Sequence, residues 1–135
     1  MVKLVRLLVA CSLAGVLAAC GGVSSPSNQA AETFSGTLDP QSQAFQNFSV
    51  GKTGELQMTL QSLDPRPVVG FLSLSIGTAS GGGCSPILGY MITQAAIGTQ
   101  YAFPRIVKGS YCVLIADSNA ILKTPVAWTL RLSHP

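Results

Sequence analysis

The stretch Gly54-Glu55-Leu56-Gln57-Met58-Thr59-Leu60 indicates the fold class, because apolar and polar side chains alternate along it without interruption. A period of two is typical of a β-strand with one buried face, whereas a helix would scatter the three apolar residues around its circumference. Three further rows have the same period: Leu72/Leu74/Ile76, Tyr111/Val113/Ile115 and Trp128/Leu130/Leu132. Four such rows can cover one another only if two sheets pack face to face. We therefore predict an all-β domain, an antiparallel β-sandwich without a helix longer than two turns and with Trp128 in its interior.

The remaining segments are interpreted from turn residues and local alternation. Further strands are expected at Phe34–Leu38, Ala44–Val50 and Val69–Ile76. The segment Tyr111–Ile115 is apolar on both faces, which favours the centre of a sheet. The glycine-rich tract Gly77–Pro86 is expected to be a loop, and residues 87–103 are expected to hold two weak strands. Four aromatic side chains are assigned to the core: Phe34, Phe45, Tyr111 and Trp128.

The N-terminal segment has the layout of a secretory signal, with Lys3 and Arg6 followed by an apolar run. The run ends in Leu17-Ala18-Ala19-Cys20, which resembles the bacterial lipobox, where cleavage precedes a cysteine that receives lipid. We therefore expect a cleaved lipoprotein signal peptide over residues 1–19, a lipidated Cys20 and flexible tether over 20–32, and the β-sandwich over 33–135. An ordinary secretory signal and a retained membrane helix are the alternatives, but a spanning helix needs about 20 apolar residues.

The lipobox resemblance implies a location as well as an attachment. The protein is expected in the cell envelope, held to the membrane by its lipid anchor. Gly21 follows the cysteine at the position where an aspartate would act as an inner-membrane retention signal, so the outer membrane is the expected address, on its periplasmic or its surface face.

Charge is sparse in the expected mature chain. Six of the eight basic residues and all five acidic residues follow residue 19, so the mature protein is nearly neutral and its charges are dispersed. A nucleic-acid surface needs clustered lysine and arginine. The sequence therefore argues against a nucleic-acid partner.

The cysteines are accounted for individually. Cys11 falls in the signal peptide and Cys20 is expected to carry lipid, which leaves Cys84 and Cys112. A disulfide is the expected state of such a pair in an oxidising compartment. A metal site or a nucleophilic thiol is the alternative, but two cysteines and one histidine cannot supply four zinc ligands. We predict a Cys84–Cys112 disulfide, no metal and no cofactor.

Several motifs, taken in order, resemble a known family. They are Phe34-Ser35-Gly36-Thr37-Leu38, the strand at 54–60, a glycine-rich cysteine loop, Gly109-Ser110-Tyr111-Cys112-Val113 and Trp128-Thr129-Leu130-Arg131-Leu132. This series resembles the bacterial pre-peptidase C-terminal-like domain, a jelly-roll-like β-sandwich of secreted proteins. The C-terminal part also resembles small secreted bacterial proteins of unknown function, through Gly109, Tyr111, Cys112, Val113, Asp117, Pro125, Val126, His134 and Pro135. The resemblance implies a freestanding accessory module, and the family has no assigned catalytic residues.

Few residues are candidates for chemistry. His134, the sole histidine, is expected to be exposed at the chain end. Asp117, in Asp117-Ser118-Asn119, is expected to form an Asx-turn, with calcium binding as the alternative. The motif Gly83-Cys84-Ser85-Pro86 lacks the spacing of a nucleophile turn. No catalytic residue is therefore assigned.

Ligand binding, if there is any, is expected in the irregular segment that contains Tyr90 and Tyr101, because binding residues concentrate on loops. The sequence thus favours a non-catalytic, membrane-anchored envelope module with an accessory or structural role and an envelope protein as partner. A carbohydrate- or peptidoglycan-binding module is the alternative, and a hydrolase is a remote one.

Overall fold

The computed structural model describes residues 29–67 and 70–135. The expected signal peptide, Cys20 and most of the expected tether lie outside the described residues. Eight strands follow one another along the chain: β1 (Ala30–Leu38), β2 (Gln43–Val50), β3 (Gly54–Asp64), β4 (Leu72–Ser80), β5 (Gly83–Ala95), β6 (Gln100–Ile106), β7 (Gly109–Ala116) and β8 (Val126–His134). In these two ranges there is no helix long and apolar enough to cross a membrane.

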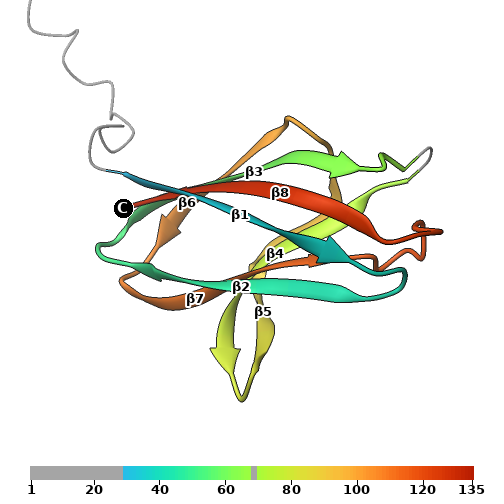
Figure 1. The fold of residues 1–135 in the computed structure, drawn as a ribbon. Coiled ribbons are helices and arrows are strands. Elements are labelled where there is room, and N and C mark those ends of the chain that lie inside the picture. The colour runs from blue at the N-terminus through green and yellow to red at the C-terminus, as the bar shows by residue number, and fades with distance from the viewer. Residues whose placement is uncertain (1–28, 68–69) are drawn as a thin grey trace, which may run out of the picture.

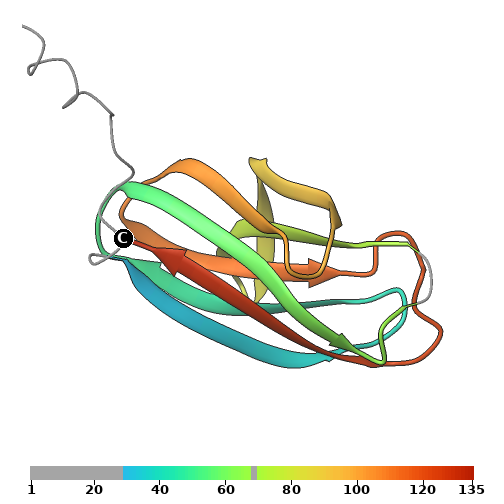
Figure 2. The ribbon, with the colours of Figure 1, turned by 90° about the horizontal axis from the view of Figure 1, so that it is seen from above.

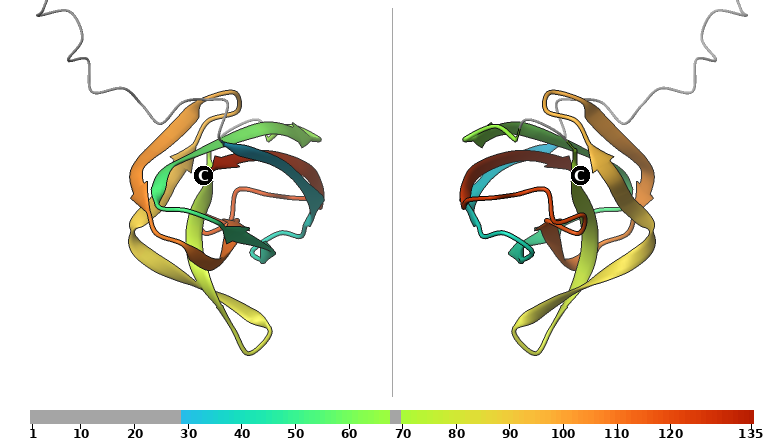
Figure 3. Two further views of the ribbon diagram at one scale, coloured as in Figure 1. Left: turned by 90° about the vertical axis from the view of Figure 1, so that its left-hand side faces the viewer. Right: turned by 90° about the vertical axis from the view of Figure 1, so that its right-hand side faces the viewer.

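The strands form two four-stranded antiparallel sheets that pack face to face (Figures 1 and 3). The first sheet has the order β1-β8-β3-β6 and the second has the order β2-β7-β4-β5. Four antiparallel pairs are nested in the chain, β1 with β8, β2 with β7, β3 with β6, and β4 with β5. The chain is therefore one long hairpin rolled into two sheets, which is the arrangement of an eight-stranded jelly roll. The predicted antiparallel β-sandwich is confirmed.

The core lies between the sheets and is built from the alternating rows. Every residue of the four rows that predicted the fold is buried, and Trp128 is only 2 % exposed. Burying one large apolar side chain stabilises a domain by about 1.5–3 kcal/mol. Strand β7 is central in its sheet and buried on both faces, as its apolar sequence predicted: Tyr111, Val113 and Ile115 belong to the core, and the alternate residues pack in a second cluster with Cys84 and Phe45.

The glycine-rich tract expected to be a loop is instead the tip of a hairpin. Strands β4 and β5 are joined at Gly81 and Gly82, whose φ angles of +56° and +82° suit a tight turn. Figure 1 shows this β4–β5 hairpin projecting from the body of the sandwich. The prediction of a loop over residues 77–86 is therefore wrong, because the disulfide and the turn glycines extend the two strands.

Residues 87–103, expected to hold two weak strands, contain most of β5 and the first part of β6, and β5 is irregular. Ser75 of β4 pairs with Met91, whereas Gly77, two residues on, pairs with Pro86. Four residues of β5, 87–90, thus lie opposite the single residue Ile76 of β4, so the β5 side of the ladder has three extra residues. Such a bulge interrupts the period of two on which strand prediction depends.

Two strand boundaries also differ from expectation. Strand β1 begins at Ala30, inside the expected tether, because Ala30 pairs with His134 at the end of β8. Strand β4 begins at Leu72, three residues after the expected start at Val69.

The start of β1 and the C-terminus lie at one end of the sandwich, as Figures 1 and 2 show. The backbone N–H of Gly51, in the β2–β3 turn, donates to the carbonyl oxygen of Pro135 over 3.1 Å. The side-chain amide of Gln29 donates to the carbonyl oxygen of Glu55 over 3.4 Å. The residues preceding Gln29 therefore connect to the domain at the end where the β2–β3 turn and the C-terminus meet.

Candidate functional site

Cys84 and Cys112 form the predicted disulfide, with their Cα atoms 5.9 Å apart. Cys84 belongs to β5 and Cys112 to β7, and β4 runs between these two strands. Gly77 of β4 is the register partner of Cys112, and a Cβ atom at Gly77 would lie 2.9 Å from Cys84 Sγ and overlap the carbonyl oxygen of Ser85. Because glycine has no Cβ atom, position 77 leaves space for the disulfide to cross β4. The bond fastens the β4–β5 hairpin to the sandwich at a residue that follows the turn glycine Gly82 by two positions.

The side chain of Asp117 links the loop after β7 to the distant turn between β1 and β2. Its Oδ2 accepts hydrogen bonds from the backbone N–H groups of Gln41, at 2.9 Å, and of Leu122, at 3.2 Å. Its Oδ1 accepts from the backbone N–H of Ile121 at 2.8 Å. The side chain is buried. The side chain accepts from residues four and five positions on, not two as in an Asx-turn, so Asp117 stabilises a wider loop than expected and reaches the β1–β2 turn as well.

The ionised form of this carboxyl group is favoured. Burial acts to raise the pKa of Asp117, but the backbone hydrogen bonds from Gln41, Ile121 and Leu122 and the charge of Lys123 outweigh it, so the pKa lies below its ordinary value. Calcium was the alternative role. Both carboxylate oxygens accept backbone N–H groups, and among the described residues no three His, Cys, Asp or Glu side chains gather as a metal site would require.

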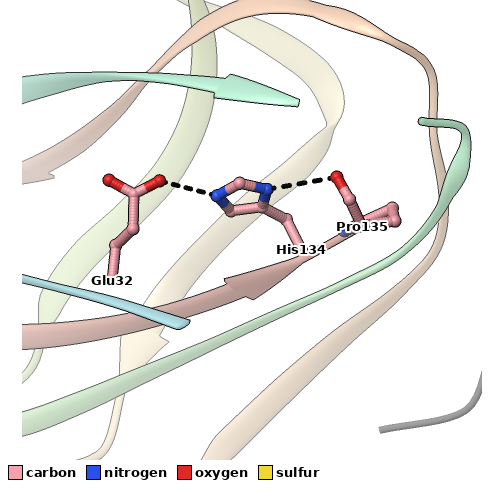
Figure 4. A network of polar contacts seen from close by, with 3 residues as sticks. All are labelled: Glu32, His134 and Pro135. Carbon is pink, nitrogen blue, oxygen red and sulfur yellow. Dashed lines mark hydrogen bonds and ion pairs between the residues drawn. The ribbon is translucent and has the colours of Figure 1, made fainter. Parts of the chain in front are cut away.

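His134 is buried, which contradicts the prediction of an exposed terminal histidine (Figure 4). Its Nε2 lies 2.7 Å from Oε1 of Glu32, and its ring lies against Phe48 with the ring centroids 5.3 Å apart. Its Nδ1 faces the carbonyl oxygen of Pro135 at 3.4 Å. The prediction failed because β8 reaches the end of the chain and pairs with β1 there, so that His134 points into the sandwich. The pair fixes the first residues of β1 to the last residues of β8.

Tyr90 and Tyr101, the two candidate ligand-binding residues, join the edge strands β5 and β6. The Tyr90 hydroxyl donates to the carbonyl oxygen of Arg105, and its ring packs on Phe103 with centroids 5.2 Å apart. The Tyr101 hydroxyl accepts from the backbone N–H of Ala96 at 2.8 Å and donates to the carbonyl oxygen of Gln94 at 3.2 Å. Both rings are half-buried. Their hydroxyl groups therefore hold together the two sheets at the β5–β6 side.

Several surface hollows lie in the described part of the domain, and two of them have volumes of about 610 and 400 Å³. The larger, of about 610 Å³, lies near the start of β4 and is lined by residues that include Arg66, Phe71 and Ile121. It adjoins residues 68–69, which lie outside the described residues. The smaller, of about 400 Å³, lies on the outer face of the first sheet, the sheet seen from above in Figure 2.

The smaller hollow is polar and has a regular construction. Thr33, Arg131, Thr59 and Gln100 lie in register across all four strands of the first sheet. The side chains of Arg131, Thr59 and Gln100 line the hollow together with those of Gln57, Gln61 and Ser133. We call these six side chains the polar face. Gln57, Thr59, Arg131 and Ser133 alternate with the buried rows, so the sequence pattern alone places them outside, whereas only the register shows that they lie together with Gln61 and Gln100.

The comparisons with known proteins leave the family open. No known family model matches the sequence, and a search of curated proteins finds no match. The resemblance to the pre-peptidase C-terminal-like domain therefore stays a prediction.

Proposed function

We propose that this protein is a lipid-anchored, non-catalytic module of the bacterial cell envelope, in which a rigid β-sandwich is held at the membrane, with the outer membrane as its address, for an accessory or interaction role. The anchor rests on the sequence Leu17-Ala18-Ala19-Cys20. Three acyl chains, as a lipobox cysteine carries, would bind a bilayer effectively permanently, since two already give stable attachment.

A single observation carries the non-catalytic part of the proposal: the groups that could perform chemistry maintain the fold instead. Asp117 is bound by three backbone N–H groups, and His134 is buried against Glu32 and Phe48. The two cysteines are joined to each other. An enzyme needs a nucleophile or acid–base pair that can reach a substrate, and these groups already have partners within the protein.

The position of the tether also supports a display role. Residues 20–29 would lead from the lipid to the end of the sandwich where β1 begins and β8 ends. A tether of these ten mostly small and polar residues spans roughly 17 Å. Both sheet faces and the β4–β5 hairpin would then stay clear of the headgroups. A glycan-binding role is the second candidate, and the polar face is the observation that favours it.

Fractionation of cells that express the full chain tests the anchor and the address. We expect the wild-type protein in the outer-membrane fraction and a Cys20→Ala protein in soluble form, with the Cys84–Cys112 disulfide intact in both. The disulfide serves as the control for folding. A Cys20→Ala protein that stays in the membrane fraction to the same extent would contradict the proposed anchor.

In-cell crosslinking tests the interaction role. Ser80, the last residue of β4, is exposed, and the β4–β5 hairpin projects from the sandwich (Figure 1), so Ser80 is a suitable position for a photo-crosslinking amino acid. A defined crosslinked species is expected with the anchored protein and not with the soluble Cys20→Ala protein. Equal crosslinking of both would contradict a role that depends on the membrane.

A further inference from the structure

We propose that the polar face binds a carboxylated glycan strand, with Arg131 pairing to a sugar carboxylate and Thr59 and Gln100 bonding to sugar hydroxyl groups. This ligand class deepens the proposed function, on which it rests for its place in the envelope. Arg131 is exposed, lines the hollow of about 400 Å³ and sits at the centre of the register row across the first sheet.

The charge of Arg131 is available to a ligand. All five acidic residues of the chain lie among the described residues, and none of them has an oxygen within 4 Å of Arg131. The acid nearest along this face is Glu55, which accepts a hydrogen bond from the Gln57 amide. Thr59 is the register partner of Arg131, and Glu55 precedes Thr59 by four residues. In an extended strand this spacing puts the Cα atoms of Glu55 and Thr59 about 13 Å apart. Salt weakens the attraction between the two charges over that distance, because the Debye length in physiological salt is about 8 Å.

The neighbours of Arg131 suit sugars in particular. Hydroxyl and amide side chains can both donate and accept, as sugar hydroxyl groups do. The strands of a sheet are spaced about 4.8 Å apart, so the row from Arg131 through Thr59 to Gln100 offers polar groups at intervals close to the length of one pyranose ring. An arginine fork pairs bidentately with a carboxylate, which a uronic acid or a lactyl-substituted sugar carries.

The same lining argues against other ligand classes. It contains no aromatic or branched aliphatic side chain, whereas protein interfaces centre on such anchors. A nucleic-acid site would need several cations, and the hollow has one. Because no aromatic platform is present, binding by one copy would be weak, and many copies on one membrane would strengthen it through multivalency.

Calorimetric titration of the full chain in detergent with oligogalacturonate tests the proposal. We expect binding that weakens at least about tenfold in Arg131→Gln, as the loss of a charge-assisted hydrogen bond implies. Binding should also weaken in Thr59→Val. Arg105→Gln is the matched control, because it removes the same charge from an exposed residue outside the hollow and should leave the affinity unchanged. Neutral malto-oligosaccharide and poly-glutamate are the comparison ligands, and both should bind markedly less well.

Three results would overturn the proposal: no binding of oligogalacturonate at millimolar concentration, equal weakening by Arg131→Gln and Arg105→Gln, or equal binding of poly-glutamate. The Cys20→Ala protein separates this proposal from the anchor. It should bind the glycan like the wild type even though it leaves the membrane. Loss of glycan binding with intact anchoring would refute the ligand class alone.

Discussion

The carboxylate of Asp117 accepts a hydrogen bond from the backbone N–H of Gln41, a residue 76 positions earlier in the chain. The contact joins the loop after β7 to the turn between β1 and β2. Gln41 has a φ of +54°, in the left-handed region that non-glycine residues rarely adopt. The hydrogen bond to Asp117 therefore holds a strained backbone position at the end of the sandwich away from the termini.

Replacing Asp117 by asparagine should destabilise the domain by about 1.5–3 kcal/mol, because an amide NH₂ group would then face backbone N–H donors. Chemical denaturation at neutral pH measures this change. Asp39→Asn is the matched control, since Asp39 is exposed and its backbone carbonyl, not its carboxylate, accepts from Ser42. The control should change stability by no more than about 0.5 kcal/mol. A similar loss in both variants would contradict the role assigned to Asp117.

The lowered pKa of Asp117 predicts how this stabilisation depends on pH. A carboxyl group with a lower pKa in the folded state than in the unfolded state stabilises the fold above the unfolded value, here near 3.8. That contribution is lost as the pH falls through the lower folded value. The difference in unfolding free energy between wild type and Asp117→Asn should therefore shrink as the pH is lowered below about 4. A difference that stays constant down to that range would count against the ionised carboxylate as its cause.

Gly77→Ala should impair formation of the Cys84–Cys112 disulfide, because a methyl group there would overlap the Ser85 backbone and crowd Cys84 Sγ. Gly83→Ala is the control on the same hairpin, since its nearest neighbour would lie at 3.6 Å, an ordinary contact. Thiol counting and non-reducing peptide mapping of the exported proteins measure the outcome. Finding both cysteines free in the wild type would refute the disulfide. Full oxidation and unchanged stability in Gly77→Ala would show that the disulfide does not need glycine at position 77.

Trp128 and Gly36 are register partners, and a Cβ atom at Gly36 would lie 3.0 Å from Cζ2 of the indole ring. Trp128→Ala should cost about 3–5 kcal/mol, the range for removing a large buried aromatic side chain. Gly36→Ala should cost about 1–3 kcal/mol by overpacking. The smaller ring in Trp128→Phe leaves room, so Gly36→Ala should cost less in that background than in the wild type. Additive costs in this double-mutant cycle would show that the two residues do not constrain each other.

The core could be predicted from the sequence because it follows a local rule. Leu56, Met58 and Leu60 alternate with polar residues, and a period of two places them on one face whatever the strand pairs with. The same rule placed Trp128 inside and β7 at the centre of a sheet. It failed at residues 87–90, because a bulge changes the period without a signal in the composition.

The candidate site could not be predicted, because register between distant strands creates it. Thr59 and Arg131 become neighbours only when β3 pairs with β8. The pairing of β1 with β8 buries His134 against Glu32, whereas its position near the chain end suggested the opposite. Asp117 was assigned a turn on local grounds, but its partner Gln41 lies in another turn of the fold. Long-range pairing, which no single segment encodes, decides each of these contacts.

Intact-protein mass spectrometry of the mature chain from membranes tests the central claim, that this sandwich is a lipid-anchored module, most directly. The account predicts a protein that begins at Cys20 and carries a diacylglycerol thioether and an N-acyl group, with two further cysteines joined as one disulfide. An N-terminus at another residue, or an unmodified Cys20 in the membrane-bound protein, would contradict it.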